Sequence, residues 1–506
     1  MATEVMKITQ NALLNLGVPN NLISEELEGI YGTSVLAELG EIIEYYKIYE
    51  AGADFDSEGT NGDYVASDLK YKLIRNLINK EARFLFSKSP DFLIKVDKSQ
   101  VKSETEKQSL DEQESQIQTL VDKVLKDNHM SSILLKAAKD CFIGKRVACV
   151  VNFNAEKGIQ VSFIPSLEFV YDVDPENNTR ITKFVAFYTI KDDKVKSNQR
   201  VYKKKYWLDN DFCYFNENIY DGNGVLVEEQ TPDTKTELDF IPAVVIINDG
   251  LTGDLLGESE VNQLIDFESY YSRLANADID AERKGMNPTR YTIDMAPEST
   301  QGLSAAAGSF WDLTSDPVRE GGTGQVGILE PSMSYSSVLA ATLDRTKTAM
   351  YEQVDVPDLT SDKLQGLVTS GKTIKALYYP LIVRCDEKML VWRPALENVV
   401  QFIVAGAKAY PDIMHMYIDE LPEIEYEINV DNQYPFPEDE AEEKAIDMSE
   451  VGNGVMSRKS YIKKWRGLTD SEAEAEIEQI AKENAILQAA VSFGVPEEAP
   501  REGDVE

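Results

Sequence analysis

Residues Val356–Ala407 read VPDLTSDKLQGLVTSGKTIKALYYPLIVRCDEKMLVWRPALENVVQFIVAGA. A polar loop containing glycine leads here into a long apolar helix, and Pro380 and Pro394 are each expected to kink or interrupt that helix. Residues 366–373, GLVTSGKT, match the phosphate-loop pattern G-x-x-x-x-G-K-S/T, which is typical of nucleotide hydrolysis. The rest of the chain decides whether this stretch is a nucleotide site or a structural junction.

A phosphate loop needs a buried hydrophobic strand directly before its first glycine, so that backbone N–H groups and a helix N-terminus converge on the phosphates. Here Pro357 and several acidic and hydroxyl side chains precede the loop and disfavour a strand. The best candidate for a Mg²⁺-binding aspartate, Asp249, precedes the loop instead of following it. We therefore favour a loop-to-helix junction, with Ser370 as N-cap and Thr373 three positions later. A P-loop ATPase motor subunit remains the alternative.

The chain has 506 residues, 42% hydrophobic residues and a formal net charge of −37. This length predicts about two to four domains, and the composition is sufficient for ordinary hydrophobic cores. Phosphate binding needs a local excess of Lys and Arg, so an acidic chain is not expected to grip nucleic acid over its general surface. The same acidity is compatible with a passage through which a polyanion slides without sticking.

No metal, cofactor or membrane span is predicted. His129 and His415 are far apart and lack partners at metal-site spacing. No apolar run approaches the roughly 20 residues of a membrane-spanning helix, and the N-terminus lacks the pattern of a secretory signal. The cysteines form no C-x-x-C pair and are expected to be buried apolar residues: Cys141, Cys149, Cys213 and Cys385.

Helical and strand patterns occur in blocks, which predicts a multidomain α+β fold. Helices are expected before residue 145, with Gly52 as one stop signal, and residues 145–248 predict an antiparallel meander or sandwich. Within it, the run at residues 203–205, KKK, is expected to be a solvated edge. Helices at 258–284 and 332–353 predict a stalk, and TRYTIDM, GSFWDL and QVGIL between them predict a small distal insert.

Four collinear passages resemble the portal proteins of tailed bacteriophages, and in particular the siphovirus-type portal family. The passages are IIEYYKIYEAG, IPAVVIINDGLTGDLLGESEVNQLIDFESYYSRLANADID, VTSGKTIKALYYPLIVRC and VMSRKSYIKKWRGLTDSEAEAEIEQIAKE. No single passage is specific, but the collinear set is. The chain departs from the family where Lys372 and Thr373 follow the Ser-Gly pair, because the family commonly has Ala there.

The resemblance implies a ring, usually of twelve subunits, at one capsid vertex. A terminase motor pumps DNA through the channel, and the ring later retains the DNA, joins head to tail and allows ejection. The implied partners are copies of the chain, the terminase large subunit, a head-completion adaptor, the major capsid and scaffold proteins, and double-stranded DNA. The resemblance also implies a non-enzymatic virion protein made in the host bacterial cytoplasm, with no membrane partner.

The resemblance assigns parts of the chain by position. The implied parts are an α+β wing (1–257 and 408–437), a helical stem (258–284 and 333–355), a clip (285–332), a tunnel loop (356–370), a long kinked helix (371–407), a helical crown (438–490) and an acidic tail (491–506). The tail is expected to be disordered.

Three groups of residues are candidate sites under this interpretation. The tunnel loop would present Leu359, Asp362, Lys363, Leu364, Gln365 and Lys372, with the two lysines either touching DNA phosphates or simply solvated. The stem would present Glu268, Asp278, Glu282 and Lys284 to the channel, or as an ordinary exposed helix face. The clip would dock partners through Arg290, Tyr291, Phe310 and Trp311, although core packing is the alternative for the last two.

Overall fold

The computed structural model of the protein describes residues 22, 26, 32–56, 65–99, 101, 103–190, 200–210, 212–286, 289–304, 311–316, 323–329, 333–359, 371–435, 440–466, 468 and 473–483. The chain divides into two compact units, residues 1–363 with 377–435, and residues 364–376 with 436–506. Each unit is described by itself. Both helices and strands are abundant, so the predicted mixed α and β class is confirmed.

The first unit begins with α3 (Gly32–Ala51) and α4 (Leu73–Phe86). Gly52 ends α3 as predicted, because its φ of 91° is a left-handed conformation that glycine adopts without strain. Helical periodicity predicts the second of these helices over Leu69–Phe86, but it begins only at Leu73, because the preceding residues are held extended against another helix.

Helical periodicity predicts one further helix before the strands, near Ile117–Cys141, but the structure has two helices there, α5 (Glu104–Asp127) and α6 (Met130–Gly144). The break lies at Asn128. Its side chain donates a hydrogen bond to the carbonyl of Ile159 at 2.9 Å and accepts one from the N–H of Val161 at 2.8 Å. Both partners are distant in sequence, so helical periodicity alone does not predict this break.

Eight strands follow, after which the chain returns to helix. They are β2 (Arg146–Asn154), β3 (Gly158–Pro165), β4 (Phe169–Val173, after the 3-10 turn η1, Ser166–Glu168), β5 (Ile181–Ile190), β6 (Arg200–Asp209), β7 (Phe212–Asp221), β8 (Leu226–Lys235) and β9 (Ala243–Ile247). One antiparallel sheet has the order β4–β5–β6–β7–β8, which confirms the meander, and another has the order β3–β2–β9. Val150, Phe184 and Tyr206 from the two sheets share one core.

The expectation that the lysine run is a solvated edge is wrong. Strand β6 lies in the middle of the five-stranded sheet, and Lys203 is only 6% exposed. Its Nζ lies 2.7 Å from Oε1 of Glu26, which also pairs with Lys205 at 3.1 Å. Lys204, on the opposite face, pairs with Glu217 at 3.5 Å. A buried lysine needs such a counter-charge, and the one for Lys203 comes from a distant part of the chain.

The long apolar stretch forms α11 (Gly371–Leu377) and α12 (Tyr379–Ala409). The helix is divided just before Pro380, as expected. Pro394 lies inside α12, which continues through it without interruption. Trp392 and Leu396 on either side of this proline are buried, so packing of the helix offsets the loss of one backbone donor.

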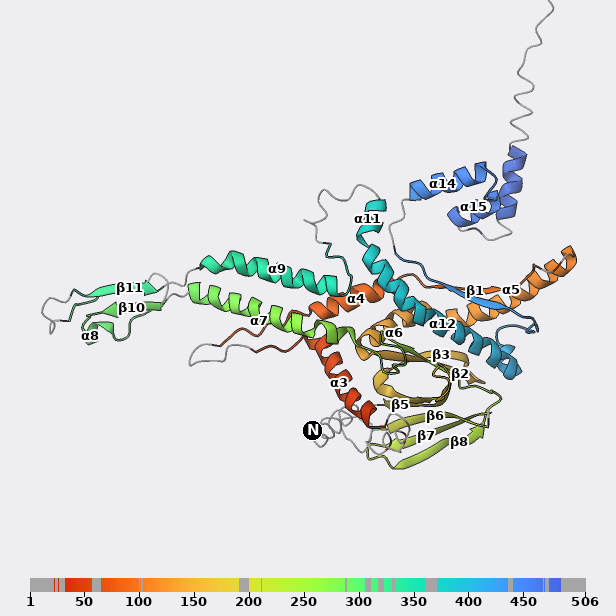
Figure 1. Ribbon diagram of the computed structural model, residues 1–506, viewed down its shortest axis with the longest axis horizontal. Coiled ribbons are helices and arrows are strands. Elements are labelled where there is room, and N and C mark those ends of the chain that lie inside the picture. The colour runs from red at the N-terminus through yellow and green to blue at the C-terminus, as the bar shows by residue number, and fades with distance from the viewer. Residues whose placement is uncertain are drawn as a thin grey trace, which may run out of the picture. The chain divides into compact units, whose positions relative to one another are not determined.

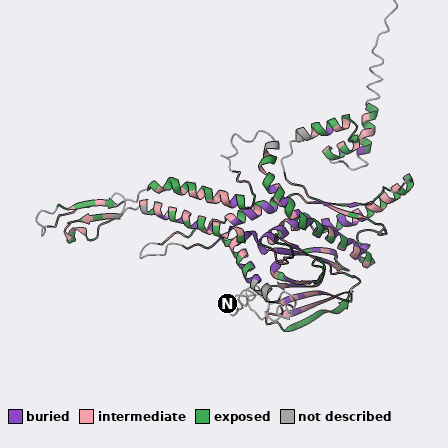
Figure 2. Cartoon of the chain, viewed as in Figure 1, coloured by how far each residue is buried: buried purple, intermediate pink, exposed green. Residues whose placement is uncertain are grey.

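After α12 the chain forms α13 (Pro411–Met414) and β12 (Glu427–Asp431). Alternating side chains at Met414–Val430 predict a strand, and β12 lies largely within this stretch. It pairs antiparallel with β1 (Asp91–Lys95), a strand that was not predicted. Buried residues gather where α4, α6, α12 and the sheets meet (Figure 2). At this centre, the Phe86 and Trp392 rings lie 4.9 Å apart in an edge-to-face arrangement.

The predicted stalk is present as α7 (Glu260–Met286) and α9 (Ser336–Gln353), which lie side by side (Figure 1). Between them come β10 (Thr289–Ile293), α8 (Pro297–Thr300), β11 (Gln325–Leu329) and the short turn η3 (Met333–Tyr335). Strands β10 and β11 pair antiparallel. The third strand expected at GSFWDL is not formed over its described residues 311–313, and only Ser315 makes an isolated bridge, to Met295.

The second unit contains α14 (Glu440–Gly452), α15 (Arg458–Arg466) and helical residues 473–483. Asp447 joins the first two of these helices: it accepts a hydrogen bond from the indole of Trp465 at 2.7 Å and pairs with Lys464 at 2.9 Å. The predicted acidic tail, residues 491–506, lies outside the described residues.

Candidate functional site

Helix α7 buries a polar face against the body of its unit. Its buried polar residues recur at spacings of eight, four, four and four along the helix: Glu260, Glu268, Ser272, Asn276 and Asp280. Positions four apart lie on one side of a helix, so these residues form a single row. Of the acidic residues predicted to line a channel or to lie on an exposed face, Glu268 belongs to this buried row.

The row holds an extended segment, residues 65–69, along α7. The Asn276 side chain pairs with both backbone groups of Leu69, accepting from its N–H at 2.8 Å and donating to its carbonyl at 2.7 Å. Asp280 accepts from the N–H of Ser67 at 3.1 Å and from its hydroxyl at 2.7 Å. Asn276 and Asp280 therefore make the hydrogen bonds to the extended backbone of residues 65–69 that a neighbouring strand makes in a sheet.

Glu268 caps the beginning of α4. Its two carboxylate oxygens accept hydrogen bonds from the N–H of Ala53 at 3.0 Å and of Ile74 at 2.6 Å. Burial raises the pKa of this carboxyl, and the backbone donors offset that effect only in part. Because Glu268 has no exposed surface, the prediction that it faces a solvent-filled channel is wrong.

The other predicted stem residues are placed differently. Asp278 is half-buried and Glu282 is exposed, while the side chain of Lys284 lies outside the described residues. Near them, the negative charge of Asp278 adds to burial in raising the pKa of Tyr71. The channel roles of these three residues stay predictions.

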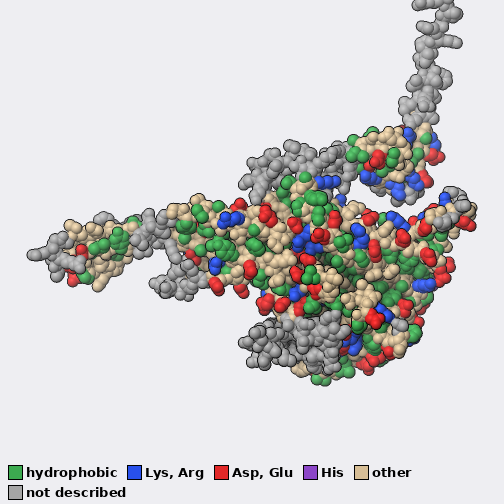
Figure 3. Space-filling view, viewed as in Figure 1, with side chains coloured by type: hydrophobic (Ala, Val, Ile, Leu, Met, Phe, Trp, Pro, Cys, Tyr) green, Lys and Arg blue, Asp and Glu red, His purple; other side chains and the backbone are tan. Residues whose placement is uncertain are grey.

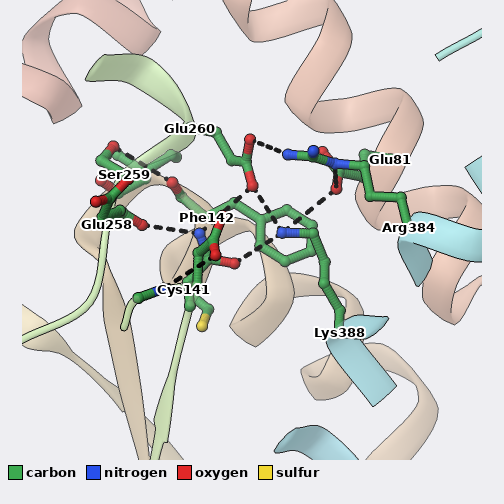
Figure 4. Close-up of polar contacts among 12 residues, drawn as sticks. Glu81, Cys141, Phe142, Glu258, Ser259, Glu260, Arg384 and Lys388 are labelled. Carbon is green, nitrogen blue, oxygen red and sulfur yellow. Dashed lines mark hydrogen bonds and ion pairs between the residues drawn. The ribbon is translucent and has the colours of Figure 1, made fainter. Parts of the chain in front are cut away.

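The base of α7 is joined to α12 by a buried group of four charges (Figure 4). Glu260 accepts from Arg384 at 2.5 Å and from Lys388 at 2.6 Å, and Arg384 also pairs with Glu81 of α4 at 2.9 Å. Lys388 lies 3.4 Å from Glu81 and donates to the side-chain carbonyl of Asn248 at 2.9 Å. Two carboxylates and two cations thus link three helices without leaving an uncompensated charge.

The four charges do not titrate alike. Burial opposes ionisation of both carboxyls, but the attraction of Lys388 and Arg384 outweighs it at Glu260 and lowers the pKa of that group. Burial prevails at Glu81 and raises its pKa. Burial also opposes the charged form of Lys388, but Glu260 and Glu81 hold the pKa of that ammonium above its usual range. These four ion-paired side chains therefore connect the first turn of α7 to α12.

The segment after α9 is described only in part. Asp358 pairs with Lys347 of α9 at 3.5 Å, and Leu359 is half-buried. The predicted loop residues Asp362, Lys363, Leu364 and Gln365 lie outside the described residues, as does the side chain of Lys372. Helix α11 begins at Gly371, as expected for a loop-to-helix junction. Residues 354–359 form no strand, so the described residues do not provide the strand that a phosphate loop needs.

The distal insert brings two predicted docking residues together. The Arg290 guanidinium lies over the Trp311 ring at 5.1 Å, and the Trp311 indole N–H donates to the carbonyl of Ser304 at 2.7 Å. Tyr291 is 43% exposed. Its ring lies so close to Gly327 that a side chain at position 327 would overlap it. Phe310 lies outside the described residues.

Several residues of this architecture were not identified from the sequence. They are Glu81, Arg384, Lys388 and Asn276. The available signal was the presence of charges inside otherwise apolar helical stripes, as in LIVRCDEKML. That signal does not reveal the partners, because Glu81 and Arg384 are 303 residues apart.

Within the described ranges, no three His, Cys, Asp or Glu residues gather in a way that could hold a metal ion. None of the helices described is long and apolar enough to cross a membrane. The four cysteines are buried and unpaired with one another. Acidic and basic side chains are interspersed over the visible face of the first unit (Figure 3).

The comparisons with known proteins bear directly on the resemblance. No curated protein matches the chain. The sequence profile of the family described as "Phage portal protein, SPP1 Gp6-like" matches residues 34–488, which include both stalk helices, the distal insert, α12 and the described helices of the second unit. The P-loop ATPase alternative is not supported. The chain therefore belongs to the SPP1 Gp6-like family of phage portal proteins and functions as a portal protein of the bacteriophage capsid in genome packaging.

Proposed function

We propose that twelve copies of the chain form a non-enzymatic ring around a DNA channel at one capsid vertex. The observation that carries this proposal is the order of elements: stalk helix, distal insert, stalk helix, the segment 356–370, then the long helix α12. This order puts the segment at the point where a stalk returns to the body of its subunit. In a ring of such stalks, it would be the part closest to the axis.

In this proposal, α7 and α9 are the stem and their outer surfaces face the channel. Glu282 is exposed and Asp278 is half-buried, so both can present negative charge to passing DNA. Like charges repel and keep a polyanion mobile. Lys284, at the end of the same helix, would supply an occasional phosphate contact.

The distal insert would be the clip. Its two-stranded sheet has exposed side chains such as Tyr291, and Arg290 with Trp311 forms an ordered aromatic and cationic surface of the kind that partner proteins use. We propose that the terminase large subunit docks here during packaging and that the head-completion adaptor replaces it. Residues 438–490, which form part of the second unit, would be the crown inside the capsid, next to scaffold and major capsid proteins during assembly in the host cytoplasm.

The experiment is deletion of Leu359–Gln365 in the full chain. We expect rings of normal symmetry by electron microscopy and a strong loss of DNA packaging when the variant replaces the wild-type protein in an infection. The reason is that the deletion removes the proposed channel constriction but no element that the structure shows packed in the core. Rings that package DNA at the wild-type level would refute the role of this loop.

Two single substitutions separate charge from loop length. Lys363→Gln removes a proposed phosphate contact, and Lys157→Gln removes an exposed lysine in the turn between β2 and β3. We expect slower packaging for Lys363→Gln alone. Equal packaging by the two variants would limit the role of the loop to its shape.

A further inference from the structure

Helix α12 has two apolar faces. The side chains of one face are at most 2% exposed and form the core of the first unit: Leu381, Cys385, Met389, Trp392, Leu396 and Val399. The other face, which we name the outer face of α12, consists of Tyr379, Val383, Leu390, Val391 and Pro394, all of them exposed. Leu390 is 72% exposed and Tyr379 is 64% exposed.

Four residues of the outer face lie on one side of the helix. At about 100° per residue, Tyr379, Val383, Leu390 and Pro394 project within roughly 60° of one another, opposite the buried face. A helix on the surface of a protein normally presents polar residues on its outward side. An apolar stripe in that position indicates a surface that another molecule covers.

The stripe leads into a groove of about 530 Å³. Val391, Pro394 and Phe402 form one wall of this groove, and residues of the two sheets, including Leu208 and Val245, form the other. A groove beside an exposed apolar helix face can accept a protruding segment of a partner protein, while the helix face packs against the rest of that partner.

The charges beside the stripe argue for a protein partner. Between Tyr379 and Pro394, the exposed charged residues of α12 are Asp386, Glu387 and Arg393, so this surface lacks the local excess of Lys and Arg that DNA contact needs. Within a ring of identical subunits, every subunit contributes one surface to the neighbour on one side and a different surface to the neighbour on the other. The outer face of α12 is a surface of this kind in a chain whose family assembles as a homo-oligomeric ring.

We propose that the outer face of α12, together with its groove, is the subunit interface that receives a neighbouring copy of this chain. The proposal rests on the proposed ring and adds which surface closes it. Because the contact is head-to-tail, the neighbour contributes a different surface, and the outer faces of two copies do not meet each other.

The test is the double variant Leu390→Glu with Val391→Glu. We expect the fraction of protein in rings to fall at least about tenfold, because two carboxylates would enter an apolar contact. Both positions are exposed in the single chain, so its thermal unfolding should be unchanged. Ser115→Glu with Gln116→Glu is the matched control, since it adds the same two charges to an exposed part of α5.

Light scattering and negative-stain microscopy give the readout. Rings in the double variant at the wild-type fraction overturn the proposal while leaving the proposed function intact. If the wild-type chain forms no rings under any assembly condition, the proposed function itself fails.

A photo-crosslinker identifies what covers the stripe. Leu390→p-benzoylphenylalanine should link two chains in the ring, and mass spectrometry should map the partner peptide to a segment other than α12. Attachment within one chain, to residues 440–483, would assign the stripe to the chain's own second unit and overturn the proposal.

Discussion

Replacing Glu260 tests whether the buried charges hold the stalk to the long helix. Glu260→Gln keeps the size of the side chain but removes one of two negative charges facing Arg384 and Lys388, which lie 2.5 and 2.6 Å away. Only Glu81 then remains to balance two buried cations. Removing one partner of a buried ion pair costs about 3–5 kcal/mol, and we expect the free energy of unfolding to fall by that amount.

The loss should depend on pH. The folded state lowers the pKa of Glu260 from its ordinary value of 4.5, so its charge stabilises the fold above that pH, and the contribution disappears as the pH falls through the folded-state value. The difference between wild-type and Glu260→Gln should therefore be largest near pH 7 and shrink below about pH 4.5. Glu81 has a raised pKa and acts in the opposite sense, favouring the fold at low pH.

The assay is urea denaturation followed by circular dichroism, at a concentration where light scattering shows monomers. Glu258→Gln is the matched control, because it makes the same chemical change at an exposed position two residues away and should change stability by less than about 0.5 kcal/mol. Adding Lys388→Met to Glu260→Gln should recover part of the loss. A Glu260→Gln variant as stable as Glu258→Gln would refute the idea that this group anchors the stalk.

The remaining predictions concern packing and helix capping. Gly406→Ala should lower stability by about 1–3 kcal/mol in calorimetry, because a Cβ there would overlap the Phe153 ring; Gly452→Ala, with open space around it, should be neutral or slightly stabilising. Glu268→Ala should cost about 1–3 kcal/mol and speed amide hydrogen exchange at Ala53 and Ile74, since both N–H groups lose their acceptor. Unchanged exchange at these two amides would contradict the capping role.

Local signals predicted the stalk and the sheet well. The stalk helix extends over 27 residues because apolar side chains recur at helical spacing, and strands β4 to β8 follow runs of β-branched and aromatic residues between turn signals. The ends were predicted where one residue determines them, as at Gly52. The break at Asn128 and the strand β1 were missed, since both depend on partners far along the chain.

The roles of individual charged residues were the least predictable part of the candidate site. Glu268 and Glu282 look alike in the sequence of one helix, yet the first caps α4 from a fully buried position and the second is exposed. Which side of α7 meets the body of the subunit depends on Ala53 and on residues 65–74, and helical spacing carries no information about those partners.

The sequence by itself determined the class of the protein: the order of helical and strand blocks, the stalk with its insert, and the collinear passages of a phage portal protein. Those features follow from short-range periodicity and turn chemistry, which adjacent residues encode. Only the tertiary structure decided that Glu260 and Glu81 meet Arg384 and Lys388, that Lys203 is buried beneath Glu26, and that α12 presents a second apolar face. Burial and charge pairing depend on groups brought together from distant parts of the chain, and one-dimensional patterns do not contain those distances.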